Sequence, residues 1–147
     1  MNQDEVVQYI HDTFDGVETT TAMDYIFFFY RSERKFPFVT IATTDNEYDR
    51  VSQLDRPGVF RLNIGVNRDT YRALFGPPPR LGADGVVETD HDFSALDRLM
   101  PHPVYAPQSW VCILSPSAET FQQTVQPLLA EAYEMALKRH AKTQPAE

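Results

Sequence analysis

The segment 56–75 constrains the fold more than any other part of this 147-residue chain. Over residues 58–66 its side chains alternate, with Phe60, Leu62 and Ile64 two positions apart and polar or smaller residues between them. This alternation is typical of a β-strand that buries one face. We therefore expect a strand over residues 58–66 whose apolar face lies against the core.

A short helix is expected directly after this strand. Asn67 is a residue type that commonly caps helix N-termini, and Tyr71 and Phe75 fall on one helical face. Gly76 and the three prolines after it cannot continue a helix. The sequence thus predicts a helix over residues 67–75.

The N-terminal part predicts one helix and two strands. Residues 2–15 carry apolar side chains three to four positions apart, and Asn2 with Glu5 matches a capping box. Two stretches rich in β-branched and aromatic residues follow, at 23–30 and 36–44. The polar link between them has the length of a hairpin loop, which indicates two antiparallel strands.

The second half of the chain begins with a long connection over residues 77–104, rich in proline, glycine and acidic residues. We expect a short helix within it at 94–99 and an apolar strand after it at 109–114. Ser115 as N-cap should start the C-terminal helix, which Pro127 should kink. Long ordered connections are often where binding sites lie.

This order of elements predicts the fold class. Alternating βαβ units, which a parallel sheet requires, are absent. We expect one α+β domain over residues 1–147, with a two-layer architecture in which helices pack on one face of an antiparallel sheet. Its length suits a single core, and residues 142–147 are expected to form a disordered tail.

The composition limits which classes of binding partner and which cellular compartment we expect. The formal net charge is −8, which disfavours non-specific binding to nucleic acid or to an anionic membrane. The N-terminus lacks the basic and apolar regions of a signal peptide, and no apolar run is long enough to span a membrane, so we expect a cytoplasmic protein. The single cysteine, Cys112, lies in an apolar run and is expected to be a buried, inert thiol.

The polar face of the 58–66 strand is the first candidate site. Arg61 and Asn63 project from the same side, and arginine is well suited to hold a carboxylate or phosphate. Gly65 and Asn67 could leave backbone amides exposed at the start of the next helix. The alternative is an ordinary solvated sheet face, which is common in antiparallel sheets.

His102, Tyr105 and Trp110 form the second candidate site, in a proline-rich stretch that holds its backbone stiffly. A histidine beside aromatic residues could act as an acid or a base. The alternative is a rigid connection in which the aromatic rings pack on the core and His102 caps a backbone group. No obvious nucleophile lies nearby in the sequence.

Two acidic runs, Asp90–Asp92 and Asp45–Asp49, contain residue types that bind metals. Neighbouring residues in a run point apart, and the second run lacks the glycine and the closing glutamate of a calcium loop. We interpret both as solvated loops, and we expect no metal and no cofactor. The basic residues of the 31–35 hairpin could contact phosphate, but Glu33 interrupts them and a solvated turn is the alternative.

Several segments together resemble a known family: Arg56–Val66, Leu74–Gly76, Leu96–Leu99, His102–Ala106 and Trp110–Val111. They are similar to an uncharacterised bacterial family, domain of unknown function 6194, over nearly the whole chain. That resemblance implies no established activity. A more distant similarity to MmcQ/YjbR-like proteins implies a fold like that of type III secretion chaperones, in the order α-β3-α-β2-α, and DNA binding through wing-like loops.

Three functional hypotheses follow. The leading one is a cytosolic, non-catalytic binding domain with a pocket for a small anionic ligand or a protein partner, in which Arg61 and Asn63 are the polar anchors and His102, Tyr105 and Trp110 line the pocket. The second is a small enzyme that uses His102 as acid or base and Arg61 as anion partner. The third is DNA binding through the 31–35 hairpin. A homodimer is compatible with each.

Overall fold

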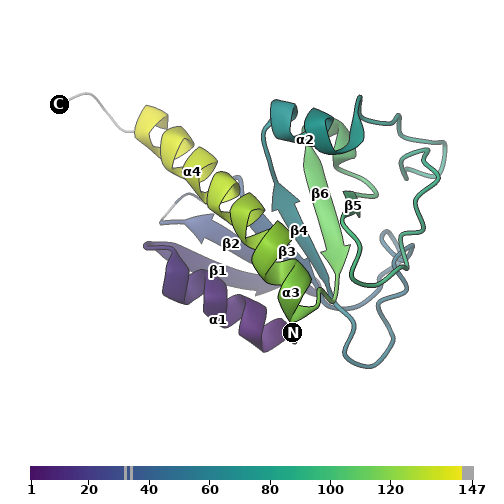
Figure 1. Cartoon of the computed structure of the whole chain (residues 1–147), viewed down its shortest axis with the longest axis horizontal. Helices are drawn as coiled ribbons and strands as arrows, with labels where there is room; N and C mark the ends of the chain where they lie inside the picture. Colours follow the sequence, from purple (N-terminus) through teal and green to yellow (C-terminus); the bar gives the residue numbers. More distant parts are fainter. Residues whose placement is uncertain (32, 34, 144–147) are drawn as a thin grey trace.

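The computed structural model describes residues 1–31, 33 and 35–143. In this part of the chain the strands form one six-stranded antiparallel sheet in the order β1-β2-β3-β4-β6-β5 (Figure 1). The strands are β1 (Val17–Ala22), β2 (Tyr25–Tyr30), β3 (Val39–Ala42), β4 (Arg61–Gly65), β5 (Met100–Pro101) and β6 (Trp110–Leu114). The α+β class and the antiparallel sheet expected from the sequence are thereby confirmed.

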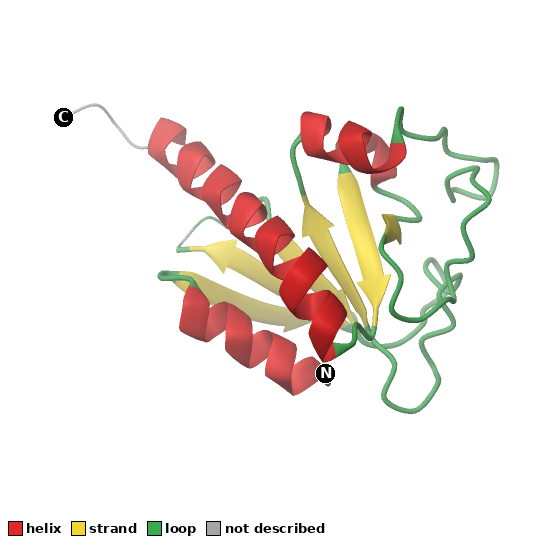
Figure 2. Cartoon of the chain, in the orientation of Figure 1, coloured by secondary structure: helices red, strands yellow, loops and turns green. Residues whose placement is uncertain are grey.

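The helices are α1 (Gln3–Thr13), α2 (Arg68–Phe75), the 3-10 turn η1 (Ala106–Gln108), α3 (Ala118–Thr120), the π-helical turn η2 (Phe121–Val125) and α4 (Gln126–Thr143). Helices α1 and α4 lie across the same face of the sheet, and α2 lies at the end of β4 and β6 (Figures 1 and 2). No helix in the described residues is long and apolar enough to cross a membrane.

The start of α1 follows the predicted capping box. The Asn2 side chain accepts a hydrogen bond from the Glu5 amide at 2.8 Å, and the Asn2 amide donates to the Glu5 carboxylate at 3.0 Å. These two bonds satisfy backbone donors that a helix N-terminus leaves without intrahelical partners. The helix then buries Val6 and Ile10 against the sheet.

The C-terminal helix begins later than the sequence suggested. Ser117, and not Ser115, is the N-cap, and its hydroxyl accepts from the Thr120 amide at 3.1 Å. Ser115 instead has a φ of 40° and its hydroxyl accepts from the amide of Phe60. The π-helical turn ends just before Pro127, which has no N–H to continue the regular α-helical ladder.

Two elements differ from the sequence prediction. Residues 94–99 form no helix and are mostly irregular, with an isolated parallel bridge between Leu96 and Leu114. Residues 17–22 form β1, which pairs with β2 through a turn at Met23 and Asp24, so four strands and not three precede α2. The expected order α-β3-α-β2-α is therefore not confirmed. Both turn residues have positive φ, 54° and 68°, a conformation that the sequence gives no reason to expect because glycine is absent.

The apolar core lies between the sheet and the helices. Leu62 and Ile64 of β4 are fully buried there, as the alternation predicted. On the opposite face, the irregular segment 45–57 contacts β2 and β4 through polar side chains that are described below. The tail expected from residue 142 lies partly within α4, and residues 144–147 lie outside the described residues.

Candidate functional site

Arg61 is fully buried at the start of β4, with its guanidinium enclosed by hydrogen-bond partners. Its two terminal nitrogens bind both carboxylate oxygens of Asp49, Nη1 to Oδ1 at 2.9 Å and Nη2 to Oδ2 at 2.6 Å. Nη1 also donates to the Ser52 hydroxyl at 2.9 Å, and Nε donates to Asn63 Oδ1 at 2.8 Å. Each guanidinium nitrogen is therefore engaged within the protein.

The same network continues across β3 and β2. Asn63 donates to the Thr40 hydroxyl at 3.0 Å, and the Tyr25 hydroxyl donates to Asp49 Oδ2 at 2.6 Å. Asn46 in turn donates to the Tyr25 hydroxyl at 3.2 Å. Three strands and the 45–57 segment thus share one set of polar contacts, which fixes that segment on the sheet.

The charges of this network stabilise each other. Burial would raise the pKa of Asp49, but the hydrogen bonds and charge of Arg61 outweigh it and hold that pKa below its usual value. Burial alone would lower the pKa of Arg61, but the hydrogen bonds and charge of Asp49 outweigh it, so this pKa lies above its usual value. For Tyr25, burial and the bond to Asp49 raise the pKa to about 12, so the phenol stays protonated.

His102 is buried, with 3% of its surface exposed. Its Nδ1 accepts hydrogen bonds from the amides of Val104 and Tyr105, both at 3.0 Å. An Nδ1 that accepts twice carries no proton, so the neutral ring is assigned its proton on Nε2. Burial, with a smaller effect of the Arg61 charge, places the pKa of His102 well below 6.5. This geometry matches a backbone-capping histidine.

Aromatic contacts connect His102 to the two other residues of the second candidate site. The ring centroids of His102 and Tyr105 are 5.0 Å apart, and those of His102 and Trp110 are 6.5 Å apart in an edge-to-face arrangement. Tyr105 is 55% exposed, and Trp110 is partly exposed. The structure therefore brings the rings of Tyr105 and Trp110 into contact with one residue, His102.

Cys112 lies beside the Arg61 network on β6, opposite Asn63. Its side chain is fully buried, and the thiol donates to the carbonyl of Pro101 at 3.6 Å. Burial raises the pKa of the thiol to about 12. The prediction of a buried cysteine is confirmed, and a thiol with this pKa does not ionise at neutral pH.

A groove opens where α4 passes the ends of β3, β4 and β6, and we call it the Trp110 groove. It is a cavity of about 260 Å³ whose wall is mostly aromatic and apolar. Its lining residues are Phe36, Pro37, Phe38, Gly65, Val66, Gln108, Trp110, Met135 and Arg139. A Cβ added at Gly65 would lie 3.0 Å from Cε2 and Cζ2 of Trp110, so the indole lies directly against the glycine backbone.

Arg139 supplies the charge of the Trp110 groove. Its Nε is buried, and it has no hydrogen-bond partner among the residues that the structure describes. Burial lowers the pKa of Arg139, and the nearby charge of Glu33 opposes this effect. An arginine remains protonated at neutral pH even when it is partly buried, so the groove holds a cation with an unused donor.

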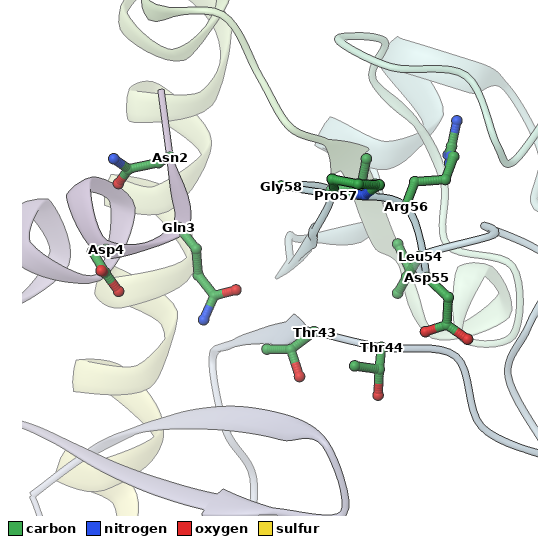
Figure 3. Close-up of a pocket in the computed structure, with 11 residues that line it drawn as sticks. Asn2, Gln3, Asp4, Thr43, Thr44, Leu54, Asp55, Arg56, Pro57 and Gly58 are labelled. Carbon is green, nitrogen blue, oxygen red and sulfur yellow. The ribbon is translucent and has the colours of Figure 1, made fainter.

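A second, wider depression of about 650 Å³ lies between the start of α1 and the segment 54–59 (Figure 3). Gln3, Thr43 and Leu54 are among its lining residues. Figure 3 shows the side chain of Arg56 turned away from α1, and its guanidinium donates to the carbonyls of Ser52, Gln53 and Ser94. The depression therefore presents hydroxyl, amide and carboxylate groups, and its one cationic lining residue, Arg56, is bound by Nε and Nη2 to backbone carbonyls.

The five residues predicted for one site occupy two environments. Arg61, Asn63 and His102 are buried, whereas Trp110 lines a groove and Tyr105 is exposed beside His102. Their role in ligand binding stays a prediction. Sequence reasoning missed Arg139, because an arginine in the polar pattern of a C-terminal helix gives no local signal that its Nε is buried.

The other candidates of the sequence are placed as follows. Asp92 accepts from the amide and hydroxyl of Ser94. No group of three or more His, Cys, Asp or Glu side chains in residues 1–31, 33 and 35–143 is arranged to hold a metal. In the 31–35 hairpin, Ser32 and Arg34 lie outside the described residues.

Comparison with known proteins gives one match. No curated protein and no solved structure matches the chain. One family model, described as a family of unknown function (DUF6194), matches residues 1–145. Because this match covers nearly all of the 147 residues, the chain belongs to the family DUF6194.

Proposed function

We propose that this protein is a cytosolic, non-catalytic binding domain whose Trp110 groove holds a small ligand. The observation that carries the proposal is a concave, mostly apolar cavity with one charged side chain whose Nε has no partner among the described residues. Small-molecule sites in proteins commonly have this composition, an apolar wall with a few polar groups that fix the orientation of the ligand.

The residues predicted from the sequence then have two kinds of role. Trp110 contacts the ligand, and His102 supports the indole through an edge-to-face ring contact and is itself packed against Tyr105. Arg61 and Asn63 lie farther along β4 and hold this strand, with the 45–57 segment, in place. The absence of a catalytic role is proposed because the buried His102 uses Nδ1 to accept backbone hydrogen bonds and Cys112 is a protonated, buried thiol.

The proposal can be tested with the single tryptophan of the chain. Trp110 lines the groove, so its fluorescence emission reports on ligands that enter there. A screen of small organic molecules should find compounds that change this emission and raise the midpoint of thermal unfolding.

A variant that fills the groove identifies the binding site. Gln108→Phe adds a ring at an exposed lining residue and should abolish the response, whereas Gln122→Phe, the same change at an exposed glutamine of η2, should leave it intact. Compounds that bind both variants equally well would contradict the proposal, as would a screen without any compound that changes Trp110 emission.

A further inference from the structure

The Nε of Arg139 is the one buried polar atom in the Trp110 groove that lacks a hydrogen-bond partner in the described part of the chain. A buried donor without a partner is costly, and native proteins rarely leave one. The Nε itself has no exposed surface, whereas the Arg139 side chain as a whole is partly exposed and lines the groove, so a ligand oxygen reaches the guanidinium through its terminal nitrogens. A ligand with an anionic oxygen satisfies these donors and the charge of the guanidinium together.

The charges around the groove favour an anion with a single charge. Lys35 places its ammonium 5.4 Å from the ring centroid of Phe36, which lines the groove. Glu33 lies close enough to influence Arg139, and its carboxylate accepts from the amide of Lys35 at 2.7 Å. Of these three described groups Arg139 alone lines the groove, and together they sum to one positive charge, although the whole chain carries −8.

The shape of the groove favours a small planar ligand. A cavity of about 260 Å³ lies just below the range of about 300–1,000 Å³ that is common for drug-sized ligands. Phe36 is exposed and Trp110 is partly exposed, and both offer ring surface that can stack on a flat apolar body, while the buried Phe38 closes the wall behind them. The arginine fork is matched best by the two oxygens of a carboxylate.

From these features we propose that the Trp110 groove is a binding site for small aromatic monocarboxylates, with Arg139 as the partner of the carboxylate. This inference rests on the proposed function, because it requires that the groove admit small molecules. It adds the chemical class of the ligand and a residue that recognises it.

The test uses benzoate as the probe and benzamide as its uncharged analogue, titrated against Trp110 fluorescence. Benzoate is expected to bind with a dissociation constant of about 0.1–1 mM and at least about tenfold more tightly than benzamide. Arg139→Gln should reduce benzoate affinity by about tenfold or more and leave benzamide affinity unchanged. Arg139→Lys, which retains the charge without the fork, should give an intermediate loss.

The control is Arg72→Gln, the same substitution at an exposed position of α2 outside the groove, which should not change either affinity. Equal affinities for benzoate and benzamide, or an unchanged benzoate affinity in Arg139→Gln, would overturn the inference. A short peptide with a C-terminal phenylalanine is the competing occupant, and tighter binding of that peptide than of benzoate would also overturn it.

The two proposals fail in different ways. If benzoate does not bind but other compounds of the screen lose their effect in Gln108→Phe, the carboxylate inference is wrong and the groove remains a binding site. If no compound of any class changes Trp110 emission, both proposals are wrong.

Discussion

Replacing Asp49 by asparagine is the most informative perturbation of the buried network. The guanidinium of Arg61 is fully buried, and 10% of the Asp49 side chain is exposed. Asp49→Asn keeps the size of the side chain but removes the negative charge opposite Arg61. The new amide NH₂ is a hydrogen-bond donor, and it would face an N–H donor of the guanidinium. The variant thus leaves a buried, uncompensated cation.

The expected loss can be worked out in two ways. Breaking one partner of a buried ion pair costs about 3–5 kcal/mol. Two hydrogen bonds to charged groups, at about 1.5–3 kcal/mol each, give a similar total of about 3–6 kcal/mol. We expect the free energy of unfolding to fall by about 3–5 kcal/mol, a large part of the roughly 5–15 kcal/mol that is typical of a folded domain.

Urea denaturation followed by circular dichroism measures this change, and a thermal midpoint lowered by about 10–15 °C should accompany it. The control is Glu47→Gln, an isosteric loss of charge at an exposed residue of the same segment, which should cost less than about 0.5 kcal/mol. A double-mutant cycle with Arg61→Met should give a coupling energy of at least about 2 kcal/mol. If Asp49→Asn unfolds within 1 kcal/mol of Glu47→Gln, the structural role assigned to this ion pair is wrong.

Three further predictions concern His102, Cys112 and Gly65. Because the pKa of His102 is depressed in the folded state, only the unfolded chain takes up its proton just below about pH 6.5, and the free energy of unfolding should fall there by up to about 1.4 kcal/mol per pH unit. In urea titrations His102→Asn should flatten this slope. The control is His11→Asn, the same change at an exposed histidine. Cys112 should not react with a thiol reagent such as Ellman's reagent until urea unfolds the protein, and rapid labelling of the native state would contradict its burial. Gly65→Ala should displace the Trp110 ring, shift its emission maximum and cost about 1–3 kcal/mol of stability, whereas an unchanged emission spectrum would show that the indole does not lie against Gly65.

Elements with a local signal could be predicted from the sequence. The capping box of Asn2 and Glu5, the alternation around Leu62 and the cap at Asn67 each depend on residues within a few positions of one another, and the structure has each of them. Strand β1 contains β-branched residues, but its hairpin gave no turn signal, since the turn uses Met23 and Asp24 in a conformation more usual for glycine or asparagine.

The candidate site was less predictable because its contacts are long-range. Arg61 alternates with apolar neighbours, a pattern that also describes a solvated sheet face, and its partner Asp49 lies twelve positions earlier in an irregular segment. The pairing depends on how that segment folds over the sheet. Likewise, the Trp110 groove combines residues from four separate parts of the chain, and only the tertiary structure places Arg139 beside Phe36.

The most direct test of the account is a map of chemical-shift changes in the ¹H–¹⁵N spectrum of the wild-type protein as benzoate is added. The account predicts changes concentrated at the Trp110 indole N–H, the Gly65 amide and the Arg139 Nε–H, with little change at Thr43 and Thr44 of the wider depression. Changes concentrated at that depression, or no changes at any position with benzoate in the millimolar range, would contradict the claim that the Trp110 groove is the binding site.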